Sequence, residues 1–498
     1  MPTALACPAC RTGILARRGD PLCPTCGKAA REMPAGPLWV FDSLLLREAL
    51  AQVNLAAVPA IVRAACGLSQ RDLATIVGWN PATLSYYERG QRDGMFDVRT
   101  VLQFADALGM PRALLSLVFA DIGAGQAGGT GCGVSVELSR GGPASLEADA
   151  SPLASVPQSA SDSQVRYWRA CTAALYIRDR AVGGTALLPS ALQQWQRAVP
   201  AVQGARAGAS APQLLGASAE LALCTGWIAL DAGHLTLVRP LYEKARELAV
   251  SAGDVTLAVH ALISQSMLHA EMGRTGSSPE SARQALRLAY QAADEGRYVP
   301  MPPLHALIAL RHAGAASLLG DKAAFQAAIG QARRELNRGP WDGDPPQWLR
   351  FVSETEITET EATGYLDLGD AARSAMLYQQ VLTSDLSPRN RASNAVGLAD
   401  ALLRQGAHQE AVATATDVLP ALESGVTSVR CLNRLRLIRR AVDNISWAQE
   451  FRERFDAAEQ ALTATCSLAR NDAPFVGDKS LGTGYGMLAS GESLSLPV

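Results

Sequence analysis

A chain of 498 residues is too long for one hydrophobic core, so we expect several domains. Hydrophobic residues make up 48% of the chain and aromatic residues only 5%, a balance carried by alanine that favours packed helices over sheets. The formal net charge of −2 excludes a globally basic nucleic-acid-binding protein. Residues 1–120 carry 12 Lys and Arg against 9 Asp and Glu, so a polyanion is expected to bind at this end.

No apolar run approaches the roughly 20 residues that a membrane helix needs, and the first residues do not have the pattern of a signal peptide. The sequence therefore predicts a cytoplasmic protein. Four of the ten cysteines form two close pairs near the amino terminus. This arrangement suits metal binding in a reducing compartment better than disulfides.

Residues 1–36 contain too few large apolar residues to fold by burial alone. The segment needs an additional cross-link to hold a fold. The pairs Cys7, Cys10 and Cys23, Cys26 are separated by 12 residues. Four thiolates at this spacing can close a tetrahedral shell around one structural Zn²⁺ ion per chain, with Gly27 in the second tight turn. The segment resembles zinc ribbons and rubredoxin-type knuckles. The alternative, a redox dithiol, needs a thioredoxin-like fold that this short segment cannot build.

The zinc module also carries basic side chains that either contact DNA phosphates or form an ordinary solvated surface: Arg11, Arg17, Arg18, Lys28 and Arg31. The sequence does not decide between these alternatives.

Residues 38–120 carry the pattern of a small helical domain. Ser69 can cap a helix with Leu73, Ala74 and Val77 on its inner face, and Gly78 can make a sharp turn. A second helix follows, with Asn80 as cap, Pro81 at its first position, and Leu84 and Tyr87 inside. The closing helix contributes Val101, Phe104, Ala105 and Leu108. This segment resembles the Cro and phage-repressor type of helix-turn-helix, the XRE family, a five-helix-type domain.

The resemblance implies that the second helix enters the major groove of double-stranded DNA. The residues expected at the DNA are Gln70, Asn80, Pro81, Ala82, Thr83, Ser85, Tyr86, Arg89 and Arg92, and Gln70, Arg89 and Arg92 are expected at phosphates. Arg63 and Glu88 match a buried structural ion pair of the family. Pro81 and Ala82 depart from the family pattern, because they cannot hydrogen-bond to a base, although they can touch a thymine methyl group. Tyr86 could instead pack against a neighbouring domain, and the whole module could serve only for docking.

Residues 121–163 read as a flexible linker that predicts loose coupling between domains, and residues 469–498 as a disordered tail. Between them, residues 164–468 contain glycines at 233, 273, 320, 369 and 406, with spacings of 40, 47, 49 and 37 residues. Such a recurrence predicts an α-solenoid of helix pairs. The segments after Gly233, Gly369 and Gly406 resemble the second helix of tetratricopeptide repeats (TPR), and Ala245, Ala332 and Ala411 would let paired helices approach. An unrelated helical bundle is the alternative.

No convergent set of catalytic groups is apparent, so we expect no enzyme. Four acidic residues in one helix could hold a metal ion or a cation, but a solvated helix face is favoured for Glu354, Glu356, Glu359 and Glu361. The sequence thus predicts a dimeric transcriptional regulator whose repeat domain senses a peptide, a small ligand or a protein partner. The alternative is a TPR scaffold or adaptor whose zinc and helix-turn-helix modules only anchor an assembly.

Overall fold

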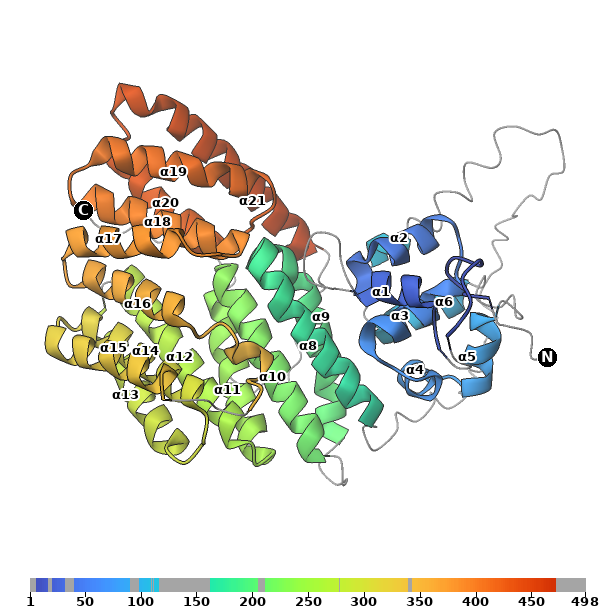
Figure 1. Ribbon diagram of the computed structural model, residues 1–498. Coiled ribbons are helices and arrows are strands. Elements are labelled where there is room, and N and C mark those ends of the chain that lie inside the picture. Colours follow the sequence, from blue (N-terminus) through green and yellow to red (C-terminus); the bar gives the residue numbers. More distant parts are fainter. Residues whose placement is uncertain are drawn as a thin grey trace, which may run out of the picture.

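The computed structural model describes residues 6–16, 20–31, 40–89, 98–108, 110, 112–115, 162–204, 211–276, 278–338 and 343–471. Almost all of the predicted linker, the predicted tail after Asn471, and Arg92 lie outside these ranges. The mainly α fold is confirmed, because every regular element in the described ranges is a helix and the antiparallel pair Ala6–Ile14 is an isolated bridge (Figure 1).

The amino-terminal part, called the head here, comprises the described residues from 6 to 115. Its elements are α1 (Pro24–Arg31), η1 (Val40–Asp42), α2 (Leu44–Ala51), α3 (Ala57–Cys66), α4 (Gln70–Val77), α5 (Pro81–Glu88), α6 (Val98–Leu108) and η3 (Arg112–Leu115). Helix α1 packs on α2 and α3, so the cysteine segment and the helix-turn-helix share one buried cluster. The cysteine segment therefore gains apolar contacts that it cannot supply by itself.

The carboxy-terminal part, called the repeat domain here, is built from helices that pack in consecutive pairs, as in a helical solenoid. The pairs are α8 (Asp162–Val182) with α9 (Gly184–Gly204), α10 (Ala211–Asp231) with α11 (Leu235–Ser251), α12 (Val255–Gly276) with α13 (Pro279–Gly296), α14 (Pro302–Leu318) with α15 (Lys322–Leu336), α16 (Glu354–Asp367) with α17 (Ala371–Leu382), α18 (Pro388–Arg404) with α19 (His408–Glu423), and α20 (Val429–Ala441) with α21 (Gln449–Asn471). Two short helices, η5 (Gln347–Leu349) and η6 (Ser446–Ala448), lie in the connections.

Four of the five predicted turn glycines lie at turns between paired helices. Gly233, Gly320, Gly369 and Gly406 have φ angles of 77°, 76°, 82° and 80°, in the left-handed region that favours glycine. The prediction for Gly273 is wrong, because this residue lies inside α12. That pair instead turns before Ser278, whose hydroxyl caps α13 by accepting from the Ser281 amide at 3.3 Å.

A second set of glycines lets an aromatic ring pass between helices. A Cβ at Gly226 would lie 2.4 Å from the Tyr242 ring, and one at Gly397 would lie 2.4 Å from the Tyr378 ring. Gly364 meets Phe325 in the same way, at 2.2 Å. These distances are too short for any real Cβ. The close approach of the helices at Gly226, Gly364 and Gly397 therefore requires glycine at each position.

The first and last helix pairs of the repeat domain meet each other. The Thr427 amide donates to the Val182 carbonyl at 2.7 Å, and the Ser428 hydroxyl donates to Asp231 at 2.8 Å. Arg389 of α18 also pairs with Asp179 of α8 at 3.1 Å. In Figure 1, α18 and α21 accordingly reach one end of the α8–α9 pair, where α18 contacts α8 and α21 contacts α9. The predicted curved solenoid is thus bent far enough for its ends to make contact.

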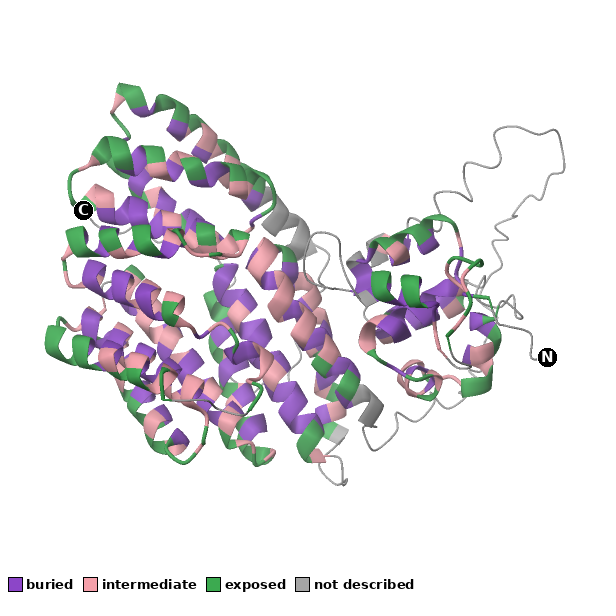
Figure 2. Ribbon diagram, viewed as in Figure 1, coloured by how far each residue is buried: buried purple, intermediate pink, exposed green. Residues whose placement is uncertain are grey.

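Helix α10 is long and apolar enough to cross a membrane by length and composition alone, whereas no stretch of this kind was expected from the sequence. However, 83% of its apolar window is buried in the structure, and Figure 2 shows it among the mostly purple helices of the repeat domain. Such burial is expected of the central helix of a packed domain.

The head and the repeat domain touch directly. Helix α8 packs on α3 and α4, and Arg166 of α8 forms a 2.6 Å ion pair with Asp72 of α4. The buried Tyr167 hydroxyl donates to the Leu108 carbonyl, at the end of α6. A direct packing surface thus joins the two parts, in addition to the linker through which the sequence predicted loose coupling.

Candidate metal centre and nucleic-acid interface

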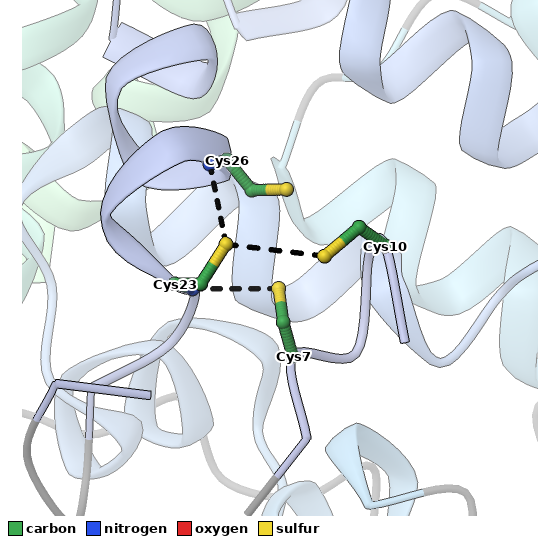
Figure 3. Close-up of side chains that lie close together, drawn as sticks. All are labelled: Cys7, Cys10, Cys23 and Cys26. Carbon is green, nitrogen blue, oxygen red and sulfur yellow. Dashed lines mark hydrogen bonds between the residues drawn. The ribbon is translucent and has the colours of Figure 1, made fainter. Parts of the chain in front are cut away.

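The sulfur atoms of Cys7, Cys10, Cys23 and Cys26 all lie within 4.8 Å of one another, and Figure 3 shows them pointing toward a common centre. A tetrahedral Zn²⁺ shell with Zn–S bonds of about 2.3 Å has edges of about 3.8 Å. The Sγ atoms of Cys10 and Cys23 are 3.9 Å apart, close to that edge. A set of four sulfur donors at these distances fits a closed, tetrahedral metal site.

The first cysteine pair lies in a tight knuckle. The Cys7 amide donates to the Gly13 carbonyl at 2.7 Å, and the Gly13 amide donates to Cys10 Sγ at 3.1 Å. A Cβ at Gly13 would lie 2.6 Å from Cys23 Sγ, inside the sulfur cluster. Gly13 was not among the predicted site residues, although a glycine three positions after a Cys-x-x-Cys pair is a recognisable signal.

The second pair differs from the expected knuckle. Cys23 immediately precedes α1 and Cys26 lies in its first turn, where the Cys26 amide donates to Cys23 Sγ at 3.5 Å. Gly27 was predicted in a turn, but it lies within α1 and donates to the Cys23 carbonyl at 2.8 Å. The described part of the cysteine segment is therefore a knuckle and a helix joined at the sulfur cluster.

The four thiols have unequal environments. The Gly13 amide lowers the pKa of Cys10 to about 6, against the smaller opposing effect of burial. Burial raises the pKa of Cys26, and its sulfur neighbours add to the effect. Without a cation, the Cys26 thiolate is thus disfavoured, and a metal ion bound by the four sulfurs would supply the positive charge that stabilises it.

Asn54 attaches the cysteine knuckle to the head. Its side-chain amide donates to the Pro8 carbonyl at 3.2 Å and lies 3.5 Å from the Ala9 carbonyl. Asn54 lies between α2 and α3 and is only 8% exposed. No local pattern predicts this contact, because the partners are 46 residues apart in the chain.

The two helices of the helix-turn-helix begin and end as their residues predict. The Ser69 hydroxyl accepts from the Asp72 amide and the Asp72 carboxylate accepts from the Ser69 amide, which makes a capping box. Gly78 has a φ of 71° and ends α4. Asn80 then caps α5 by accepting from the Ala82 amide at 2.9 Å, with Pro81 at the first position.

The predicted ion pair is present in the core of the head. Arg63 donates to both Glu88 oxygens at 2.8 Å and to the Leu68 carbonyl at 3.2 Å, and both charged side chains are less than 10% exposed. Gln70 also donates to Glu88, at 2.5 Å. Its side chain is half-buried, so the residue predicted at a phosphate is also part of this internal network.

Helix α5 buries Leu84 and Tyr87 and leaves the predicted DNA-facing side open. Asn80, Pro81, Ala82, Tyr86 and Arg89 are exposed, while Thr83 and Ser85 are partly exposed. The Tyr86 ring is 45% exposed, and the Arg89 guanidinium lies 5.1 Å from its centre. Because Asn80 Oδ1 caps the helix, the amide nitrogen of Asn80 is the donor with which it could contact a base.

The four acidic residues of α16 separate onto two sides of the helix. Glu354 and Glu361 both pair with Arg333 of α15, at 2.7 and 2.8 Å. Glu359 accepts from the buried Asn394 of α18 at 2.8 Å, and Glu356 is partly buried. These residues do not form one solvated helix face, and among the described residues the four cysteines alone qualify as a possible metal-ligand cluster.

Among known families, the model of a helix-turn-helix domain matches residues 55–118. The matched segment spans α3 to α6 and therefore includes the ion pair, the turn and the open face of α5. No curated protein matches the chain.

Proposed function

We propose that this protein is a sequence-specific regulator of transcription that binds double-stranded DNA through α5. The observation that carries the proposal is the solvent-open face of α5 on a head that matches a helix-turn-helix domain. In such domains the second helix reads base edges, while surrounding groups hold phosphates. The exposed Pro81 and Ala82 offer only apolar contacts, so discrimination would rest on thymine methyl groups, Asn80, Tyr86 and DNA shape.

We further propose that the cysteine cluster holds one Zn²⁺ ion per chain in a structural role. A closed shell of four sulfurs leaves no position for a reactive water, and the sulfur ligands suit zinc. No enzymatic activity is proposed for the chain, and the reduced thiols of such a centre fit a cytoplasmic location.

The repeat domain is proposed to be TPR-like and to sense a peptide, a small ligand or a protein partner. Stacked helix pairs form extended concave surfaces that commonly hold such partners. A nearly neutral head would bind one half-site weakly, so a homodimer on two half-sites is part of the proposal. The contact of α8 with α4 offers a direct route for coupling ligand binding to the head.

Selection of binding sequences from a random DNA library by the intact protein tests the proposal. Enrichment of a shared motif supports a regulator. Tyr86→Ala should alter the motif, with roughly 1 to 3 kcal/mol lost at one position, whereas Gln70→Ala should weaken all sites alike. Binding without sequence preference, from a chain that remains folded, would contradict the proposal and favour the scaffold alternative. Sedimentation of the same sample tests the dimer.

A further inference from the structure

The connection between α15 and α16 does not follow the direct path between its two helices. Its short helix η5 lies against α8, although α15 and α16 themselves pack on each other. The Trp348 ring of η5 also stacks on His260 of α12, with the ring centres 3.8 Å apart and the planes 9° from parallel. In Figure 1 the connection accordingly extends from α16 toward α10 and α8. The segment thus bridges two helices that are not its neighbours in the chain.

The contacts of η5 lie on the inner side of the curved repeat domain. The first helices of successive pairs pack on one another, α8 on α10, α10 on α12 and α12 on α14, so they line the inside of the curve. Both helices that η5 touches, α8 and α12, belong to this inner layer and flank α10. Residues 343–352, called the strap here, consequently cross the surface on which stacked helix pairs commonly hold a partner.

The strap is held on this surface by its side chains. Trp348 and Leu349 are buried, and both belong to the apolar cluster that includes residues of α12 and α14. Within the described residues, every hydrogen bond of the strap closes inside the strap itself. The Leu349 amide donates to the Pro346 carbonyl at 2.8 Å, and Arg350 donates to Asp344 at 2.7 Å. For these residues, separation from α8 and α12 therefore breaks apolar contacts but no hydrogen bond.

The helices beneath the strap carry polar atoms that the strap leaves unsatisfied. Tyr176 of α8 packs against the apolar cluster to which Trp348 belongs. Among the described residues, its buried hydroxyl has no hydrogen-bond partner, and neither has the buried Nδ1 atom of His260. Buried polar atoms are normally paired. An extended peptide in place of the strap would bring main-chain donors and acceptors to these atoms.

We propose that the strap is an internal occupant of a peptide-binding surface. It covers the inner side of α8 and α12 until it is displaced by a peptide with adjacent aromatic and aliphatic side chains, the pair that Trp348 and Leu349 present. Because the strap is tethered beside its site, it competes at a high effective concentration, and only a peptide with better contacts takes its place. The inference rests on the proposed function, because it assigns a chemistry to the sensed partner.

Calorimetric titration of the intact protein with a synthetic peptide of residues 343–353 tests the proposal. The double variant Trp348→Ala, Leu349→Ala loses the side chains that hold the strap and should bind the peptide at least about tenfold more tightly than wild type. A peptide with alanine at the same two positions should bind neither protein. His260→Ala, added to the double variant, removes the stacking partner and should weaken peptide binding at least about fivefold.

Arg350→Gln serves if the double variant fails to fold, because its ion pair with Asp344 is exposed and shapes only the strap. It should raise the affinity for the peptide about two- to fivefold. Arg283→Gln breaks an exposed ion pair on α13 and is the matched control that should change nothing. Equal affinity of wild type and folded variants for the peptide, equal binding of the alanine peptide, or no binding at all would overturn the proposal. Because no DNA is present, these results are independent of whether the head binds DNA.

Discussion

At the scale of single residues, two positions are fixed by what lies directly beside them. Gly13 leaves the space that Cys10 and Cys23 occupy, and the partly buried Glu356 lies where its charged form is disfavoured. Neither constraint concerns the residue's own backbone conformation. Both constraints arise from neighbouring groups: Cys23 lies beside Gly13, and burial by its neighbours, reinforced by Glu359, acts on Glu356.

Gly13→Ala should impair the metal site, because the new Cβ would lie 2.6 Å from Cys23 Sγ. We expect less than one bound zinc per chain after dialysis, and faster loss of metal to a chelator. Ile14→Ala changes an exposed neighbour, 63% accessible, and should retain the metal. Full zinc content and wild-type chelation kinetics in Gly13→Ala would contradict the assigned geometry.

Glu356 predicts a pH dependence of stability. Its pKa is raised from 4.5 to about 8 in the folded state, so the folded protein binds more protons than the unfolded chain between these values. The free energy of unfolding should therefore fall as pH rises from about 5 to about 8, by up to about 1.4 kcal/mol per pH unit from this group. Urea unfolding across this range should show a flatter slope for Glu356→Gln. The exposed Glu410→Gln should keep the wild-type slope.

At the scale of elements, helix pairs of the repeat domain depend on glycines that receive aromatic rings. Gly397→Ala should destabilise the protein by about 1 to 3 kcal/mol, because the Tyr378 ring lies 2.4 Å from the new Cβ and must move. Gly314 lies within α14 with nothing near its Cβ position, so Gly314→Ala should stabilise by up to about 1 kcal/mol. Chemical denaturation measures both. Similar changes in the free energy of unfolding for the two variants would show that the close contact of Gly397 with the Tyr378 ring does not affect stability.

At the scale of the whole molecule, α8 joins the repeat domain to the head. Tyr167→Phe removes the buried hydroxyl that donates to the Leu108 carbonyl, a loss of about 1 to 3 kcal/mol. We expect the head to become more susceptible to proteolysis and its amides to exchange faster, while α14 to α19 keep their protection. Tyr298→Phe, at an 83% exposed site, is the control. Uniform loss of protection across the chain would instead indicate global destabilisation.

Local patterns were sufficient to determine several features of this protein. The caps Ser69 and Asn80, the turn at Gly78 and the ion pair of Arg63 with Glu88 could be predicted because they follow from short-range chemistry or from a family resemblance. The four clustered cysteines were equally readable, because their spacing limits the sites they can form.

Tertiary structure alone decided the rest. Gly273 looked like the other recurring glycines, but its turn is made at Ser278, because a cap can end one helix and start the next without a glycine. The contacts of Asn54 with the knuckle and of α8 with the head join segments that are distant in sequence. Local periodicity determines which face of a helix is buried, whereas the partner of that face depends on how all the helix pairs curve together.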